Sequence, residues 1–297
     1  MLSLAKAGDI PALKHIWTAC FGDEDTYQEL FFQNRFSPEN AVVWREEGIP
    51  VGMIHLMPYF MADEAGNCHL CYYLYAVSTL PEFQGRGIST KLLRFAEDLA
   101  GKRGAAVTSL VPAETSLFDF YRKRGYHTEY SVKRVQLERP LIPDSAPMEF
   151  HSCSLKLLCA LRARYFGRTP FFVQWDEAAL RYILLESEYV GRECLAFVGS
   201  EPGYLFCEHR GNSLFVREIG CEPEDFVAVT AGLFARYPEV CRITLRLKAD
   251  SPLAGGDTVP FGMARYLPET KDKAALSMTD RFYKKETTTP YMGLMLD

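Results

Sequence analysis

The feature that most constrains the fold is a glycine loop set between an apolar strand and a long helix. Residues 68–77 have the pattern of a strand rich in tyrosine and leucine, and residues 89–102 that of a helix with one apolar face. Between them lies the segment Gln84-Gly85-Arg86-Gly87-Ile88-Ser89-Thr90. Glycines let the backbone approach a ligand closely, and a helix N-terminus presents amides to an anion. This order of elements predicts an α/β fold with a phosphate-binding site.

The side chains of this loop also suit a pyrophosphate. Arg86 supplies a positive charge, and Ser89 and Thr90 place hydroxyls in the first turn of the helix. A Gly-x-Gly sequence alone is weak evidence, but the strand before it and the helix after it strengthen the prediction.

The first half of the chain has a recognisable order of elements. Periodicity predicts two helices, three antiparallel strands, a helix, a strand, a helix and a closing strand. The expected ranges are helices near 10–21 and 25–36, strands at 41–45, 51–57 and 68–77, a helix at 89–102, a strand at 105–111, a helix at 117–124 and a strand at 132–137.

The second half repeats this rhythm loosely after a proline-rich stretch over residues 138–147. Its expected elements are helices at 155–166 and 177–185, strands at 194–198, 204–208 and 213–221, a helix at 225–237, a strand at 242–247 and a last strand at 291–296. We therefore predict two domains, residues 1–139 and 148–297, related by a degenerate internal duplication.

The segment from Tyr75 to Leu93 resembles the acetyl-CoA motif of the GNAT N-acetyltransferases, Gln or Arg followed by x-x-Gly-x-Gly or Ala. Ser89 departs from the last position of that motif. The resemblance covers residues 2–137 and implies the GNAT fold, a central mixed and mostly antiparallel sheet flanked by helices. It also implies acetyl-CoA as acyl donor, with its pantetheine arm paired to the backbone of Ala76 and Val77. The loop amides, from Gln84 through Gly85, Arg86, Gly87 and Ile88 to Ser89, would hold the pyrophosphate.

A second landmark is the segment from Leu117 to Tyr126, which is similar to the family's Phe-Tyr-x-x-x-Gly-Phe segment. The resemblance implies that Tyr121 protonates the departing CoA thiolate, a fair task for a phenol. Members of the family often have Asn seven residues before this Tyr, where this chain has Glu114. This departure removes one expected cofactor contact and places a carboxylate near the site.

The second half resembles a decayed GNAT lobe, and the whole is similar to the tandem-GNAT part of the Eis-type acetyltransferases. Residues 219–225 occupy the place of the glycine loop but are acidic, so we expect no cofactor there. In Eis-type enzymes the terminal carboxylate reaches the active site, which makes Asp297 a candidate base.

The resemblance implies a ternary-complex reaction in which a neutral amine attacks the thioester directly. A backbone N–H near Val77 would hold the oxyanion, and Tyr121 would protonate the leaving group. The group that takes the ammonium proton stays open among Glu114, Glu82, His55 and Asp297.

Two other functions remain open. The chain could be a non-catalytic acyl-CoA-binding regulatory protein on the same scaffold, or an acyltransferase with a different donor. Tandem GNAT proteins that act on peptidoglycan precursors, and mycothiol synthase, tend to carry the working loop in the second lobe, and this chain does not.

Net charge, apolar segments and cysteine spacing restrict the kinds of partner expected for this chain. The net charge of −5 argues against nucleic acid, and no segment approaches the roughly 18 apolar residues of a membrane helix, so we expect a cytoplasmic protein. Among nine cysteines only Cys68 and Cys71 lie close together, and zinc sites usually combine two such pairs or add histidines, so we expect no metal.

The acceptor is less defined. A polyamine, a small amine and a peptide amine all stay open, and the sequence does not predict the oligomeric state. Several aromatic residues fall where family members line the acceptor cleft, although their spacing also suits a core: Trp17, Phe21, Phe31, Phe32, Tyr59 and Phe60.

Overall fold

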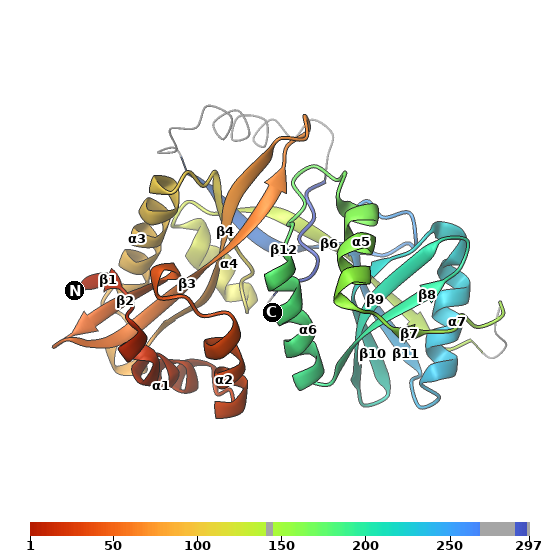
Figure 1. Cartoon of the computed structure of the whole chain (residues 1–297), viewed down its shortest axis with the longest axis horizontal. Helices are drawn as coiled ribbons and strands as arrows, with labels where there is room; N and C mark the ends of the chain where they lie inside the picture. Colours follow the sequence, from red (N-terminus) through yellow and green to blue (C-terminus); the bar gives the residue numbers. More distant parts are fainter. Residues whose placement is uncertain (141–144, 268–288, 296–297) are drawn as a thin grey trace.

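All strands of the described chain join in one sheet (Figure 1). The computed structural model describes residues 1–140, 145–267 and 289–295. The sheet has 12 strands in the order β1-β2-β3-β4-β5-β12-β6-β11-β10-β9-β8-β7. Their bounds are β1 Leu2–Leu4, β2 Ala41–Glu46, β3 Ile49–Ala62, β4 Cys68–Thr79, β5 Val107–Leu110, β6 His127–Glu138, β7 His151–Ser152, β8 Arg192–Val198, β9 Pro202–Arg210, β10 Ser213–Gly220, β11 Arg242–Lys248 and β12 Asp257–Tyr266.

The sheet is mixed and mostly antiparallel. Each half contains one parallel pair, β4 with β5 and β10 with β11, and the other neighbours run antiparallel. The helices that flank it are α1 Ile10–Phe21, α2 Asp25–Asn34, α3 Ile88–Lys102, α4 Thr115–Arg122, α5 Leu155–Phe166, α6 Glu177–Tyr189 and α7 Phe226–Arg236. This architecture confirms the fold class expected from the sequence.

Helices cover both faces of the first lobe, which comprises β1–β5 and α1–α4. The buried side of α3 carries Leu92, Leu93, Ala96 and Ala100. This side lies so close to β3 that a Cβ on Gly52 would meet Leu92 Cδ1 at 3.2 Å and the Ser78 carbonyl oxygen at 3.1 Å. Close packing thus fixes the start of α3, and with it the glycine loop, against the strands.

The second lobe comprises β7–β11 and α5–α7. Helix α7 covers a cluster of buried apolar side chains that belongs to this lobe, whereas α5 and α6 contribute to the large core cluster shared with the first lobe. Beneath α5, Arg162 forms a buried ion pair with Glu218 of β10, at 2.8 Å and 3.1 Å, and Tyr204 donates to the same carboxylate at 2.7 Å.

The two lobes share strands. β12 comes from the second half of the chain but lies between β5 and β6, and β6 of the first half pairs with β11. Figure 1 shows β6 and β12 crossing the middle of the molecule. β6 ends at Glu138, and residues 141–144 of the proline-rich stretch lie outside the described residues, so the domain limits at 139 and 148 stay predictions.

The predicted last strand was wrong for residues 291–295. This segment is buried but is not part of the sheet, because its carbonyls accept isolated hydrogen bonds: Tyr291 from the Val173 amide at 3.0 Å, Gly293 from Arg246 at 2.9 Å and Leu294 from the Trp175 indole at 2.6 Å. Leu296 lies outside the described residues. The sequence analysis missed the short strands β1 and β7 and the longer strand β12. In β12, Pro260 and Gly262 coincide with register shifts that break the alternation of the strand.

Candidate active site

The glycine loop has the conformation that its sequence requires. Gly85 and Gly87 have φ values of 74° and 73°, a region that other residues rarely adopt. A Cβ on either residue would meet no atom within 4 Å, so the backbone conformation, rather than crowding, calls for glycine here. The outer surface of the loop is therefore open to a ligand.

The amides of the first turn of α3 are available to an anion. The first hydrogen bond of the helix runs from the Lys91 amide to the Gly87 carbonyl at 3.2 Å. The amides of Ile88, Ser89 and Thr90 precede it and have no carbonyl one turn back within the helix. Arg124 donates two hydrogen bonds to the Thr90 hydroxyl, at 2.9 Å and 2.7 Å, which adds a cation beside the loop.

Side chains hold the two ends of the loop. Gln84 donates to the Thr79 carbonyl at 3.0 Å, and the Ser89 hydroxyl lies 3.2 Å from that of Thr79. Arg86 lies over the ring of Phe83 at 5.0 Å and donates to the Glu82 carbonyl at 3.2 Å. These contacts tie the loop to the end of β4.

β4 and β5 separate beside the loop. Their parallel pairing ends at Tyr73 and Ser109, while β4 continues to Thr79. On its other edge β4 bulges at Ala76 and Val77, which have no partner in the β3 register, and Ala76 has a φ of 50°. A strained non-glycine residue of this kind is frequent at functional sites.

A cleft of about 990 Å³ begins where these strands separate. Leu74, Ala76 and Val77 of β4 form one wall, and Leu110, Val111 and Tyr121 lie across from them. Residues of the second lobe complete the cleft on its far side. The structure thus brings Ala76, Val77, Tyr121 and Glu114 to one cavity, with the loop from Gln84 to Thr90 at the end of the same strand.

Tyr121 lies in the last turns of α4 and is 7% exposed. Burial raises the pKa of its phenol to about 12, against the lowering effect of the nearby Arg124. At neutral pH the group is therefore protonated and can donate a proton into the cleft.

The candidate bases lie in different surroundings. Glu114 precedes α4 as its N-cap residue and lines the cleft, whereas Glu82 is exposed and is not part of the cleft lining. Asp297 lies outside the described residues.

The buried surroundings of His55 do not suit a general base. It is 2% exposed beneath the rings of Trp17, Phe31 and Phe36, and its Nε2 has no hydrogen-bond partner among the described residues. Burial lowers the pKa of His55 to about 3. Its role in the structure is to fill the core between the sheet and the first two helices.

This burial predicts a pH-dependent stability. An unfolded histidine binds a proton near pH 6.5 and the buried one does not, so stability falls as the pH decreases below 6.5. Between pH 7 and pH 5 we expect His55 to cost the wild-type protein about 2 kcal/mol in the free energy of unfolding. Urea unfolding at both pH values should show a smaller loss for His55→Leu, and an equal loss in both proteins would contradict this assignment.

The aromatic residues divide between core and cleft. Trp17 and Phe21 line the cleft, Phe31, Phe32 and Tyr59 are buried in the core, and Phe60 is 41% exposed outside it.

The corresponding position in the second lobe is acidic. A short turn, Pro223–Asp225, precedes α7, and the Asp225 carboxylate accepts hydrogen bonds from the Ser200 amide at 2.9 Å and the Ser200 hydroxyl at 2.7 Å. A carboxylate at the start of this helix would repel a bound anion such as a pyrophosphate. That this lobe binds no cofactor stays a prediction.

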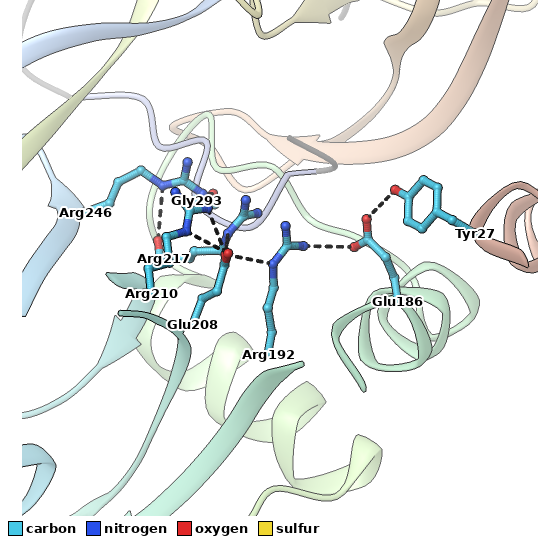
Figure 2. A network of polar contacts seen from close by, with 8 residues as sticks. All are labelled: Tyr27, Glu186, Arg192, Glu208, Arg210, Arg217, Arg246 and Gly293. Atoms are coloured by element: carbon cyan, nitrogen blue, oxygen red, sulfur yellow. Dashed lines mark hydrogen bonds and ion pairs between the residues drawn. The ribbon is translucent and has the colours of Figure 1, made fainter. Parts of the chain in front are cut away.

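The sequence analysis missed the contribution of the second lobe to the cleft. Glu186 of α6 and arginines of β8–β11 line it, and Figure 2 shows them linked in one polar network. A signal was present in the strands, because Arg217-Glu218 and Arg246 interrupt otherwise apolar sequences. Their convergence depends on tertiary structure and could not be deduced from those sequences alone.

In residues 1–140, 145–267 and 289–295 no group of His, Cys, Asp or Glu side chains is arranged to hold a metal ion. In that same part of the chain no helix is both long and apolar enough to cross a membrane.

Comparisons with known proteins concern the first lobe in sequence and both lobes in fold. Residues 2–128 match the family described as acetyltransferase (GNAT) domain. No curated protein matches the chain in sequence.

Solved structures share the fold across both lobes. A probable N-acyltransferase from Enterococcus faecalis V583 is 15% identical, with a TM-score of 0.74 over 90% of this chain and 72% of that one. Eis1 from Mycobacterium abscessus is 17% identical, with a TM-score of 0.68 over 90% of this chain and 74% of that one. A tandem GNAT protein from the clavulanic acid biosynthesis pathway is 11% identical, with a TM-score of 0.55 over 90% of this chain and 99% of that one.

Proposed function

We propose that this chain is an acetyltransferase of the GNAT family, whose domain residues 2–128 match, and that it moves an acetyl group from acetyl-CoA to a primary amine. The observation that carries the proposal is the arrangement around β4. The glycine loop follows the end of this strand, its bulge lines the cleft, and Tyr121 lies across the same cleft.

The residues present fit acetyl-CoA. The loop offers amides, an open surface above Gly85 and Gly87, and the charges of Arg86 and Arg124, which suit a pyrophosphate. Ala76 and Val77 lie beyond the end of the β4–β5 pairing and line the cleft, where an amide-bearing arm can bond to their backbone. When bound, acetyl-CoA supplies the activated acetyl group.

The protein's own groups then perform two tasks. The Val77 amide donates to the carbonyl oxygen on which negative charge develops, and Tyr121 gives its proton to the departing sulfur. Because both groups are fixed before the reaction, little reorganisation is needed.

The amine must lose a proton before it attacks. We propose Glu114 for this task, since its carboxylate lines the cleft, and the Asp297 carboxylate remains a second proposal. Glu186 is a further candidate from the second lobe, because it lines the cleft and accepts a hydrogen bond from Tyr27 at 2.8 Å.

Tyr121→Phe tests the proposal. Removal of the proton donor should lower kcat about 100-fold while the affinity for acetyl-CoA changes little. The rate is measured as release of free CoA thiol in the presence of a primary amine, and the affinity by calorimetry.

Tyr165→Phe is the matched control, since its phenol donates to the Pro202 carbonyl in the second lobe, outside the cleft lining. A full kcat in Tyr121→Phe, or an equal loss in both variants, would remove Tyr121 from the mechanism.

A further inference from the structure

The far side of the cleft is rich in arginine. Five strands of the second half of the sheet each contribute one arginine to the lining: Arg134 of β6, Arg192 of β8, Arg210 of β9, Arg217 of β10 and Arg246 of β11. The carboxylates near them include Glu186 of the lining and Glu208, and Asp257 lies opposite Arg134 in the β6–β12 ladder. The other acidic residues of the lining, Asp23, Glu24 and Glu114, belong to the first lobe. This side of the cleft therefore favours an anion.

Three of these arginines lie on neighbouring strands. Arg134 and Arg246 are directly opposite each other in the β6–β11 ladder, and Arg246 donates to the Arg217 carbonyl at 3.2 Å. Arg217 and Arg246 are only 5% and 6% exposed. Like charges directly opposite on a sheet destabilise it, and burial adds to that cost. Arg217 lies 3.7 Å from Glu208 and Arg246 donates to the Gly293 carbonyl at 2.9 Å, so this row has partners within the chain and still places its guanidinium groups at the cleft.

Glu208 shows how arginines on this side of the cleft bind a carboxylate. Its oxygens accept from Arg210 at 2.7 Å and 3.0 Å and from Arg192 at 3.1 Å, and Arg217 lies at 3.7 Å. Figure 2 shows three guanidinium groups converging on this one side chain. The planar fork of arginine matches the geometry of a carboxylate.

The other end of the network is suited to an ammonium group. Glu186 is 4% exposed, accepts from the Tyr27 hydroxyl at 2.8 Å and lies 3.5 Å from Arg192. Tyr27 in turn is 3.5 Å from the hydroxyl of Tyr75, the residue next to the bulge at Ala76. In Figure 2 the network runs from Tyr27 and Glu186 on one side to Arg210, Arg217 and Arg246 on the other.

We propose that the acceptor is a small amine that also carries a carboxylate, as an amino acid does. Its carboxylate binds the arginine side formed by Arg134, Arg217 and Arg246, and its amine points towards Glu186 and the bulge of β4. This inference rests on the proposed acetyl transfer and adds the chemical class of the acceptor.

Matched pairs of amines that differ by one carboxylate provide the test. Lysine is compared with cadaverine, and ornithine with putrescine. The wild-type protein should use the carboxylated member of each pair with a kcat/KM at least about tenfold higher. O-phosphoethanolamine beside ethanolamine asks whether a phosphate serves as well, and an equal or larger preference there would overturn the choice of a carboxylate.

Arg134→Gln identifies the surface responsible. Its side chain is exposed, so the fold should tolerate the change, and the preference for lysine over cadaverine should fall about tenfold. Arg181→Gln is the control, because Arg181 is an exposed residue of α6 that pairs with Glu177 and is not part of the cleft lining. An equal change in both variants would overturn the assignment of the arginine side.

Binding separates this inference from the proposed function. Each amine is titrated calorimetrically into the full chain saturated with CoA, so no acetyl transfer is needed. Tighter binding of lysine than of cadaverine supports the acceptor class even if transfer fails. Equal affinities, tighter binding of cadaverine or no binding of either amine overturns it, whatever the result of the Tyr121→Phe experiment.

Discussion

Gly87→Glu will weaken acetyl-CoA binding about 100-fold or more, and turnover at moderate acetyl-CoA concentrations will fall with it. Gly87 is the N-cap of α3 with a φ of 73°, so any side chain there is strained. Its Cβ would also project into the open space above the loop, where the carboxylate would face the pyrophosphate. Calorimetric titration with acetyl-CoA measures the loss.

Gly66→Glu separates the effect of charge from that of backbone strain. Gly66 has a φ of 83° and open space around it, but it lies in the turn between β3 and β4. The same substitution there should cost similar stability and leave the affinity for acetyl-CoA unchanged. Equal affinities of Gly87→Glu and wild-type protein would show that the loop does not hold the pyrophosphate.

Glu218→Gln will lower the free energy of unfolding by about 3–5 kcal/mol. The side chains of Arg162 and Glu218 are 4% and 0% exposed, so loss of one charge leaves the other buried without its counter-ion. Tyr204 also loses its charged acceptor. Urea unfolding, followed at an unchanged m-value, reports this difference.

A double variant and a surface control test whether the loss of stability comes from the buried ion pair. Arg162→Met combined with Glu218→Gln should be less destabilised than the sum of the single changes, because no charge then stays buried alone. Glu177→Gln, which breaks the exposed pair with Arg181, should cost about 0.5 kcal/mol or less. A loss of that small size for Glu218→Gln would contradict a buried, mutually dependent pair.

Local patterns predicted most elements of this fold. The helix at Leu155–Phe166 was predicted at its observed bounds, and α3 was predicted within one residue of its start. The first helix begins after Ser154, whose hydroxyl accepts from the Leu157 amide, and α3 has a strong apolar face after a glycine, so their signals do not depend on distant residues.

Long-range pairing caused the errors. β12 pairs with strands that precede it by more than one hundred residues, and no local turn signal connects them. Conversely, residues 291–295 are apolar enough for a strand, but they are anchored by single contacts to Trp175 and Arg246. Both segments are apolar because they are buried, so composition alone does not distinguish the strand from the irregular segment.

The two sides of the site also differ in how well the sequence predicts them. Gly85 and Gly87 could be recognised because the residues proposed to bind the donor form one contiguous loop. The proposed acceptor side depends on Glu186, Arg217 and Arg246, which come from three different elements and meet only when the second lobe has folded. A sequence pattern can indicate that charges interrupt apolar strands, but not that they face one cleft.

The most direct test of the central claim is to quantify both products of one reaction. The wild-type protein is incubated with acetyl-CoA and lysine, and mass spectrometry measures free CoA and N-acetyl-lysine. We expect equal amounts of the two products, and about 100-fold less of each when Tyr121→Phe replaces the wild-type protein over the same interval. CoA released without acetylated amine, or acetyl-CoA bound without release of CoA, would contradict an N-acetyltransferase; the second result would support a regulatory acyl-CoA-binding protein.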